Sequence, residues 1–231
     1  MELIAHYKKL FIWLMCCMAI ITFIGMATPA SFAAVLMVWG EIILWVMIGG
    51  KIMFSQRDAI KKYVQSLRYS WQCTFILFAT LLALLEEAIA TLMTNLAPLF
   101  GVGIGEAYLT ASTNFFDVAL FHSVVLFVPM FYGWTRLLAK YRFTPSQVFW
   151  LFGLTGMCAE FLFNRSPIGI SGLWIFVYGL MVYLPAYTLP ERPKAVVPEK
   201  KHFIVAIVYP FIFVVATIWI PFVLQHPSLH F

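Results

Sequence analysis

Seven long apolar runs are the feature that most limits how this chain of 231 residues can fold. An α-helix rises about 1.5 Å per residue, so roughly 20 apolar residues cross the hydrocarbon core of a bilayer. The runs lie near residues 10–26, 33–54, 71–93, 116–138, 146–163, 168–188 and 203–224. They lack the alternation of apolar and polar residues that a membrane β-barrel requires. The sequence therefore predicts an all-α integral membrane protein, a bundle of about seven transmembrane helices.

Composition agrees with a chain whose main solvent is lipid. Hydrophobic residues make up 63% of the chain and charged residues 11%, and the mean hydropathy is +0.91. These values lie far outside the range of a water-soluble surface. The seven runs leave no stretch for a separate soluble domain, so we expect one transmembrane domain over residues 1–231.

The distribution of lysine and arginine predicts how the protein is oriented. Basic loops remain on the cytoplasmic side of a membrane. In a seven-span topology only Arg165 of the 15 basic residues falls on the opposite side. The others share one side: Lys8, Lys9, Lys51, Arg57, Lys61, Lys62, Arg68, Arg136, Lys140, Arg142, Arg192, Lys194, Lys200 and Lys201. We therefore expect a cytoplasmic amino terminus and an outer carboxyl terminus.

The net charge of +5 follows from this topology. Clustered lysine and arginine at a cytoplasmic membrane surface favour contact with anionic lipid headgroups. The same charge is a poor indication of nucleic-acid binding, because it is distributed as the topology requires. The expected partners are thus the bilayer, with anionic lipids at the cytoplasmic face, and no nucleic acid.

Two segments allow alternative interpretations. Lys8 and Lys9, an apolar core and the small residues before Ala34 also fit a cleaved signal peptide, although we expect a retained first helix. Residues 55–70 have an apolar face at helical spacing, and Ser55 followed by Asp58 fits a capping box. They predict an interfacial helix on the cytoplasmic leaflet, or a solvated amphipathic linker.

The ionisable residues inside the spans are the candidates for function. A charge near the bilayer centre costs on the order of 3 kcal/mol, so such residues are rare unless they have a role. The seven-span topology places all of them in the outer half of the membrane. They are Glu41 in the second span, Glu86 and Glu87 in the third, His122 in the fourth, and Glu160 with the polar Asn164 in the fifth.

Helical spacing groups these residues further, because positions four apart share one face. Glu87, Thr91 and Asn95 form a polar stripe on the third span. A stripe on the fifth span has small residues below, where a neighbouring helix can approach, and polar residues above. It consists of Gly153, Gly156, Glu160 and Asn164. We expect a polar cavity near the outer surface, lined by the second to fifth spans.

The chemistry of this group follows from its residue types. Two adjacent carboxyl groups in a low-dielectric site do not both ionise readily, so one can act as a general acid or base. A nearby histidine can position water or complete a proton relay. Carboxylates with an imidazole can also hold a divalent metal, so the cofactor is either such an ion or none. Because neighbours on a helix diverge by about 100°, we expect one of Glu86 and Glu87 to face the cavity and the other to bond a neighbouring helix.

These residues resemble the motifs of the CPBP family of intramembrane proteases, which contains CAAX-processing enzymes and bacterial Abi proteins. The elements that carry the resemblance are Glu86–Glu87 followed by Thr91, then His122, then Glu160 with Asn164. The resemblance implies a polytopic hydrolase in which one glutamate and His122 activate water for attack on a peptide bond. It implies Glu86, Glu87, His122, Glu160 and Asn164 as catalytic residues.

The match has three departures from the family pattern. The first motif of the family is EExxxR, whereas Thr91 stands at the arginine position. The second is FxxxH, whereas Val118 stands four residues before His122. The third has a histidine at the position of Glu160. The similarity is confined to short patches within residues 86–164.

Two other classes of function remain open on the sequence. An acid-catalysed lipid or carotenoid-modifying enzyme also sets acidic residues against an apolar substrate, and the 18% aromatic content can stabilise a carbocation. A non-enzymatic carrier, or a structural subunit of a membrane complex, uses buried carboxyl groups to bind protons or to join helices. The expected substrate of an enzyme is a membrane-embedded peptide or lipid. The loop at residues 95–114 predicts a lid or re-entrant segment, or a flexible surface loop.

The orientation can be tested with reporter fusions. Alkaline phosphatase fused after Gly103, in a loop without lysine or arginine, should be active because the loop is expected outside. The same enzyme fused after Lys194 should be inactive, and a green fluorescent protein at that position should fluoresce. The reverse pattern would contradict the predicted orientation, and activity at both sites would contradict the number of spans.

Overall fold

The computed structural model describes residues 5–163, 168–215, 217 and 219. Within these ranges the chain forms helices and no β-strand, apart from the isolated bridges Ile104–Ala107 and Tyr141–Val196. The all-α prediction is confirmed for this part of the chain.

Each of the seven predicted spans coincides with a helix over most of its length. The helices in chain order are α2 (Lys8–Gly25), α3 (Pro29–Glu41), the π-helical segment η1 (Ile42–Gly49), α4 (Gly50–Ser66), α5 (Trp71–Asn95), the 3₁₀ turn η2 (Ala97–Phe100), α6 (Phe115–Asp117), the π-helical segment η3 (Val118–Ser123), α7 (Val124–Lys140), α8 (Pro145–Phe163), the 3₁₀ turn η4 (Ile168–Ile170), α9 (Ser171–Tyr187) and α10 (Lys200–Val214). The final ten residues of the seventh predicted span lie mostly outside the described residues.

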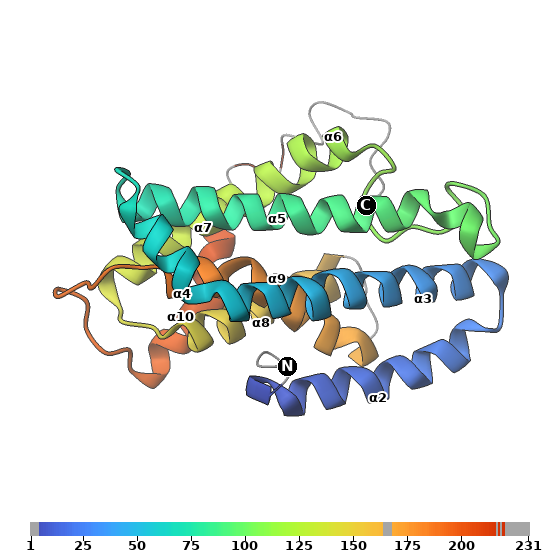
Figure 1. Cartoon of the computed structure of the whole chain (residues 1–231), viewed down its shortest axis with the longest axis horizontal. Coiled ribbons are helices and arrows are strands. Elements are labelled where there is room, and N and C mark those ends of the chain that lie inside the picture. Colours follow the sequence, from blue (N-terminus) through green and yellow to red (C-terminus); the bar gives the residue numbers. More distant parts are fainter. Residues whose placement is uncertain (1–4, 164–167, 216, 218, 220–231) are drawn as a thin grey trace.

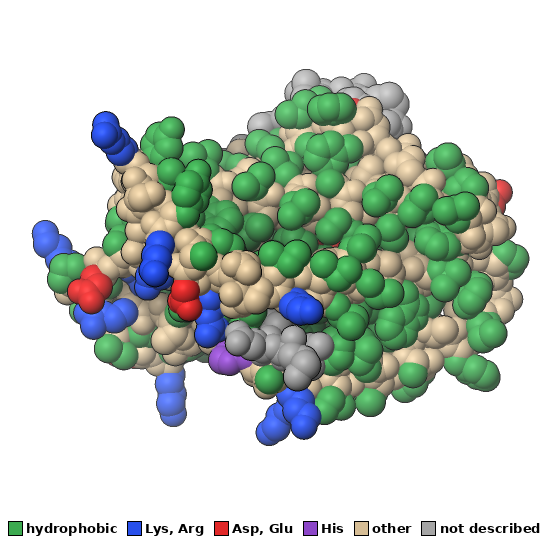
Figure 2. Space-filling model, viewed as in Figure 1, with side chains coloured by type: hydrophobic (Ala, Val, Ile, Leu, Met, Phe, Trp, Pro, Cys, Tyr) green, Lys and Arg blue, Asp and Glu red, His purple; other side chains and the backbone are tan. Residues whose placement is uncertain are grey.

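Four of the helices are long and apolar enough to cross a membrane: Lys8–Gly25, Pro29–Ser66, Trp71–Asn95 and Phe115–Lys140. Ser171–Tyr187 is apolar but shorter. Large apolar side chains on their outer faces are exposed, such as Phe23 (78%) and Leu81 (62%). Figure 2 shows hydrophobic side chains over most of one face, with lysine and arginine gathered toward the left and lower left. Such an apolar exposed surface is compatible with insertion in a bilayer.

Residues 55–66 are helical, as predicted, but they do not begin a separate helix. α3, η1 and α4 form one continuous helix over Pro29–Ser66. The predicted capping box at Ser55 is wrong, because Ser55 lies inside this helix and its hydroxyl donates to the carbonyl oxygen of Ile52 at 3.2 Å. The helix ends at Leu67, where the backbone becomes extended.

α9 is the central helix of the bundle. Thirteen of its 17 residues are buried, from Gly172 to Ala186. It packs against α8, α5, α4 and α2, and the indole nitrogen of Trp45 in η1 donates to its Val177 carbonyl at 3.2 Å. Figure 1 shows α3 and α5 running along the long axis of the molecule.

Glycines allow α8 and α9 to approach each other closely. A Cβ atom at Gly156 would lie 2.1 Å from the ring of Tyr178, and one at Gly153 would lie 2.6 Å from the carbonyl oxygen of Ile175. On the α9 side, a Cβ atom at Gly179 would meet the ring of Phe149 at 2.6 Å. The expectation that a neighbouring helix approaches Gly153 and Gly156 is confirmed, and that neighbour is α9.

α2 is packed into the bundle by specific contacts. Leu14 and Met18 are completely buried. A Cβ atom at Gly172 of α9 would come within 3.4 Å of the Leu14 backbone. The indole nitrogen of Trp39 in α3 donates to the hydroxyl of Thr22 at 2.9 Å. In this structure the first predicted span thus forms part of the helical core, whatever processing the chain undergoes.

Replacing Gly156 by alanine should destabilise the protein. The new methyl group would overlap the Tyr178 ring, and overpacking of a tight core typically costs about 1–3 kcal/mol. Gly169→Ala is the matched control, because its Cβ would lie 3.4 Å from Ile21, an ordinary contact. Thermal unfolding in detergent should show a lower midpoint for Gly156→Ala than for the wild type. The midpoint of Gly169→Ala should be unchanged. Equal midpoints would contradict the described packing of α8 on α9.

Candidate functional site

Glu87 and His122 form a hydrogen-bonded pair inside the bundle. Nδ1 of His122 lies 3.2 Å from Oε1 of Glu87. The glutamate belongs to α5 and the histidine to η3, so the contact joins two helices separated by 35 positions in sequence. The side chain of Glu87 is 7% exposed and that of His122 is 22% exposed. The predicted association of these two residues is confirmed as a direct contact.

The loop between α5 and α6 completes the surroundings of Glu87. The hydroxyl of Thr110 donates to Oε2 of Glu87 at 2.9 Å. The loop is fixed by the backbone N–H of Leu109, which donates to Thr94 at 3.0 Å, and by the amide of Asn95, which donates to the Thr113 carbonyl at 2.8 Å. It therefore folds back over the end of α5 and supplies a side chain to the site. Nothing in the sequence distinguished Thr110 from the other hydroxyls of this loop.

Glu160 forms a second polar pair on the other side of the interior. The hydroxyl of Tyr178 in α9 donates to Oε1 of Glu160 in α8 at 2.5 Å. Glu160 is 7% exposed. The close approach at Gly156, one turn before Glu160, allows the tyrosine ring to reach this position. Sequence reasoning missed Tyr178, because the chain contains ten tyrosines and only the packing of α8 on α9 selects this one.

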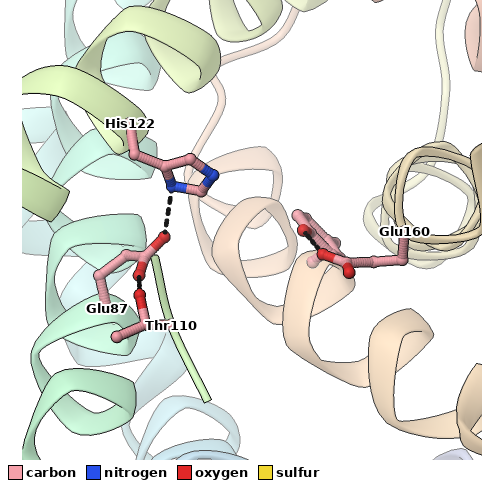
Figure 3. Close-up of polar contacts among 5 residues, drawn as sticks. Glu87, Thr110, His122 and Glu160 are labelled. Carbon is pink, nitrogen blue, oxygen red and sulfur yellow. Dashed lines mark hydrogen bonds and ion pairs between the residues drawn. The ribbon is translucent and has the colours of Figure 1, made fainter. Parts of the chain in front are cut away.

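The two pairs face each other. Figure 3 shows the Glu160 carboxyl group pointing toward His122, and the imidazole with one nitrogen on Glu87 and the other directed toward the Glu160 side. Glu160 and Glu87 both interact electrostatically with His122. The site thus contains two carboxyl groups on opposite sides of one imidazole, held by α5, η3 and α8.

Two further carboxyl groups lie in the same electrostatic neighbourhood. Glu86 interacts with Glu87, Glu41 and Glu160. Glu41 is 2% exposed, and neither of its carboxyl oxygens has a hydrogen-bond partner among the described residues. Within those residues Glu86 also has no hydrogen bond, so the expected bond from one glutamate to a neighbouring helix is not observed there. Glu87 is the member of the adjacent pair that faces His122.

The two π-helical segments in the described part of the chain adjoin this site. η1 begins directly after Glu41, and His122 lies within η3. A π-helical turn contains more residues than an α-helical turn, so it redirects the side chains that follow, and such turns are frequent at functional sites. The position of His122 therefore depends on local backbone geometry that a regular helical wheel does not describe.

Some of the predicted features lie outside what the structure describes. Asn164 is not among the described residues. Within the described ranges no three His, Cys, Asp or Glu side chains are arranged to hold a metal ion. A cavity lies at the other end of α5, around Trp71. Glu87 is sixteen residues farther along, about 24 Å at 1.5 Å per residue. The expected polar cavity and a metal at the site therefore stay predictions.

Comparison with known proteins provides no relative: no protein-family model, no curated protein and no solved structure matches the chain. The resemblance to the CPBP family therefore rests on the residues of the three short motifs.

A double-mutant cycle should detect the coupling of Glu87 and His122. We expect the stability changes of Glu87→Gln and His122→Asn to be non-additive by about 0.5–3 kcal/mol, as for residues in direct contact. Glu87→Gln combined with His202→Asn is the control, because His202 stacks on Tyr141 at the basic end of the molecule. That pair should be additive within about 0.5 kcal/mol. Additivity in both cycles would show that the Glu87–His122 contact has no energetic role.

Proposed function

We propose that the chain is a multi-pass membrane hydrolase of about seven spans whose general base is the Glu87–His122 pair. The observation that supports this most is the hydrogen bond from Nδ1 of His122 to Glu87 within an apolar helical bundle. A carboxylate bound to one imidazole nitrogen fixes the tautomer and orientation of the ring, and an imidazole oriented in this way is suited to act as a general base. Thr110 holds the carboxylate in place by bonding its second oxygen.

The proposed reaction is the hydrolysis of an acyl bond in a membrane-embedded substrate. Nε2 of His122 accepts a proton from water as the water oxygen bonds to the substrate carbonyl carbon. The bond between that carbon and the leaving nitrogen or oxygen then breaks, and the imidazolium returns its proton to the leaving group. Glu87 and Glu160, on two sides of the ring, stabilise the imidazolium by their negative charge.

Peptides are the substrate class that the sequence motifs favour. The order of Glu86–Glu87, His122 and Glu160 along the chain resembles that of the CPBP proteases. With no matching family model, the choice between a peptide and a lipid ester depends on experiment. The site region adjoins the loop after α5, so we propose that substrate reaches it from the outer part of the membrane.

One observation favours a second function, that of a structural subunit. Glu87 and Glu160 are each hydrogen-bonded to another helix, α5 to η3 and α8 to α9. Interhelical polar contacts of this kind hold membrane helices together. A structural role predicts loss of stability on mutation without loss of any reaction. The two functions therefore differ in whether conservative substitutions of Glu87 and His122 lower a reaction rate or only the stability of the protein.

The test is incorporation of ¹⁸O from labelled water. Membranes containing the wild-type chain are incubated in H₂¹⁸O, and new carboxyl groups in peptides and lipids are identified by mass spectrometry. Wild-type membranes should produce ¹⁸O-labelled acids. In membranes with Glu87→Gln or His122→Gln these acids should form at a rate lower by about 100-fold or more, since general bases contribute about 10²–10⁴ in rate. Glu106→Gln is the matched control, an exposed glutamate that bonds the Gly103 N–H in the nearby loop.

The class of labelled product separates the proposals. Labelled peptides support a protease, and labelled fatty acids support a lipid hydrolase. Addition of ¹⁸O to a polyene without cleavage would instead indicate a hydratase. The hydrolase proposal would be excluded if membranes with correctly folded wild-type protein formed no ¹⁸O-labelled product. If Glu87→Gln were also less stable than the wild type, the structural function would be supported.

A further inference from the structure

A cavity of about 380 Å³ lies between the end of α4, the beginning of α5 and the end of α9. Its apolar wall includes Val64, Phe75 and Leu189, and Trp71 and Thr74 of α5 complete one side. The amide of Gln65 donates to the carbonyl oxygens of Thr188 and Leu189 at 3.0 and 3.3 Å. These bonds join α4 to the segment after α9, so the walls of the cavity are held together by hydrogen bonds.

Arg192 is fixed beside this cavity, and Arg142 is bonded to the same segment of the chain. The guanidinium of Arg192 lies over the Trp71 ring, 5.9 Å from its centroid, and Nη1 donates to the Leu138 carbonyl. Nη2 of Arg142 donates to the Ala195 carbonyl at 3.2 Å. Burial and the positive charge of Arg142 lower the pKa of Arg192. Ala195 links the two arginines, because its N–H donates to the Arg192 carbonyl at 2.9 Å and its own carbonyl accepts from Arg142.

This positive charge is not balanced by the surrounding residues. Among the described residues the ion pairs are His122–Glu87 and Lys201–Glu199, so neither arginine has a carboxylate partner there. Two adjacent guanidinium groups attract an anion that can accept hydrogen bonds from both, and phosphate oxygens suit that geometry. The cavity thus combines an apolar wall with an unneutralised cationic edge.

An apolar path leads from the cavity along α5. Thr74, Leu77 and Leu81 are spaced by three and four residues, so they share one face of the helix. Leu77 is 56% exposed and Leu81 is 62% exposed, and both lie on a helix apolar enough to cross a membrane. A chain that leaves the cavity past Thr74 would therefore continue along a surface suited to hydrocarbon.

From these contacts we propose that the cavity binds an anionic glycerophospholipid of the surrounding leaflet. Its phosphate lies at Arg142 and Arg192, its glycerol region against Trp71 and Leu189, and one acyl chain along Leu77 and Leu81. Basic pockets between transmembrane helices at a membrane surface bind such headgroups. The proposal does not depend on the hydrolase function, because the site around Glu87 lies at the other end of α5.

The experiment measures thermal unfolding of the detergent-solubilised full chain during titration with lipid. Ligands that bind only the folded state raise the midpoint, and the rise grows with the logarithm of the ligand concentration above the Kd. Phosphatidylglycerol should raise the midpoint of the wild type, and phosphatidylcholine and inorganic phosphate should not. Arg142→Gln and Arg192→Gln should each weaken the apparent phosphatidylglycerol affinity by about tenfold, as for loss of one charge-assisted contact. Lys194→Gln, an exposed charge on the same linker, is the matched control and should stay within about twofold.

A variant that retains both arginines shows whether loss of the lipid effect comes from the cavity or from misfolding of the arginine variants. Thr74→Trp fills the cavity mouth and should abolish the effect of phosphatidylglycerol while leaving the cationic edge intact. An equal response to phosphatidylcholine, or no change in any of the three variants, would overturn the proposal. A midpoint shift reproduced by sodium phosphate alone would also overturn it, because it would identify a site for the free anion instead of a lipid.

Discussion

The close contact between α8 and α9 is the packing interaction on which the polar site depends. Gly153 and Gly156 have no side chain, so the α9 backbone and the Tyr178 ring occupy the space that a Cβ would fill. This approach places the Tyr178 hydroxyl on Glu160. It also buries α9 in the centre of the bundle, where it contacts α5 as well. Because α5 carries Glu87, the geometry between the two polar pairs is fixed by how closely two glycine-containing surfaces meet.

The sequence was sufficient to identify the helices and the candidate residues, for a physical reason. In a chain this apolar, ionisable residues within the spans are costly, so each one is informative. Glu87 and His122 were found in this way and are in contact. Thr110, the second hydrogen-bond partner of Glu87, was not found, because it lies in a loop whose fold depends on Asn95 and Thr94. Tyr178 is chosen by tertiary packing, which helical spacing does not contain.

Regular periodicity failed where the helices depart from α geometry. The π-helical segments η1 and η3 interrupt the spacing over Ile42–Gly49 and Val118–Ser123. Which side of the helix His122 faces therefore could not be read from a helical wheel. The capping signal at Ser55 was misleading for a related reason, since the preceding helix continues through it without a break. A capping motif marks the start of a helix only where the preceding helix has already ended.

The four carboxyl groups differ in how well a structural role accounts for them. Interhelical bonds account for Glu87 and Glu160, and a structural role would require no more than these. Glu41 is different, because it is buried with no hydrogen-bond partner among the described residues. Burying an unsatisfied polar group costs about 1–3 kcal/mol, and more when it is charged. Helix association alone gains nothing from that cost. The proposed hydrolase function gives that cost a use, because a buried carboxyl group close to the Glu87–His122 pair is available for proton transfer.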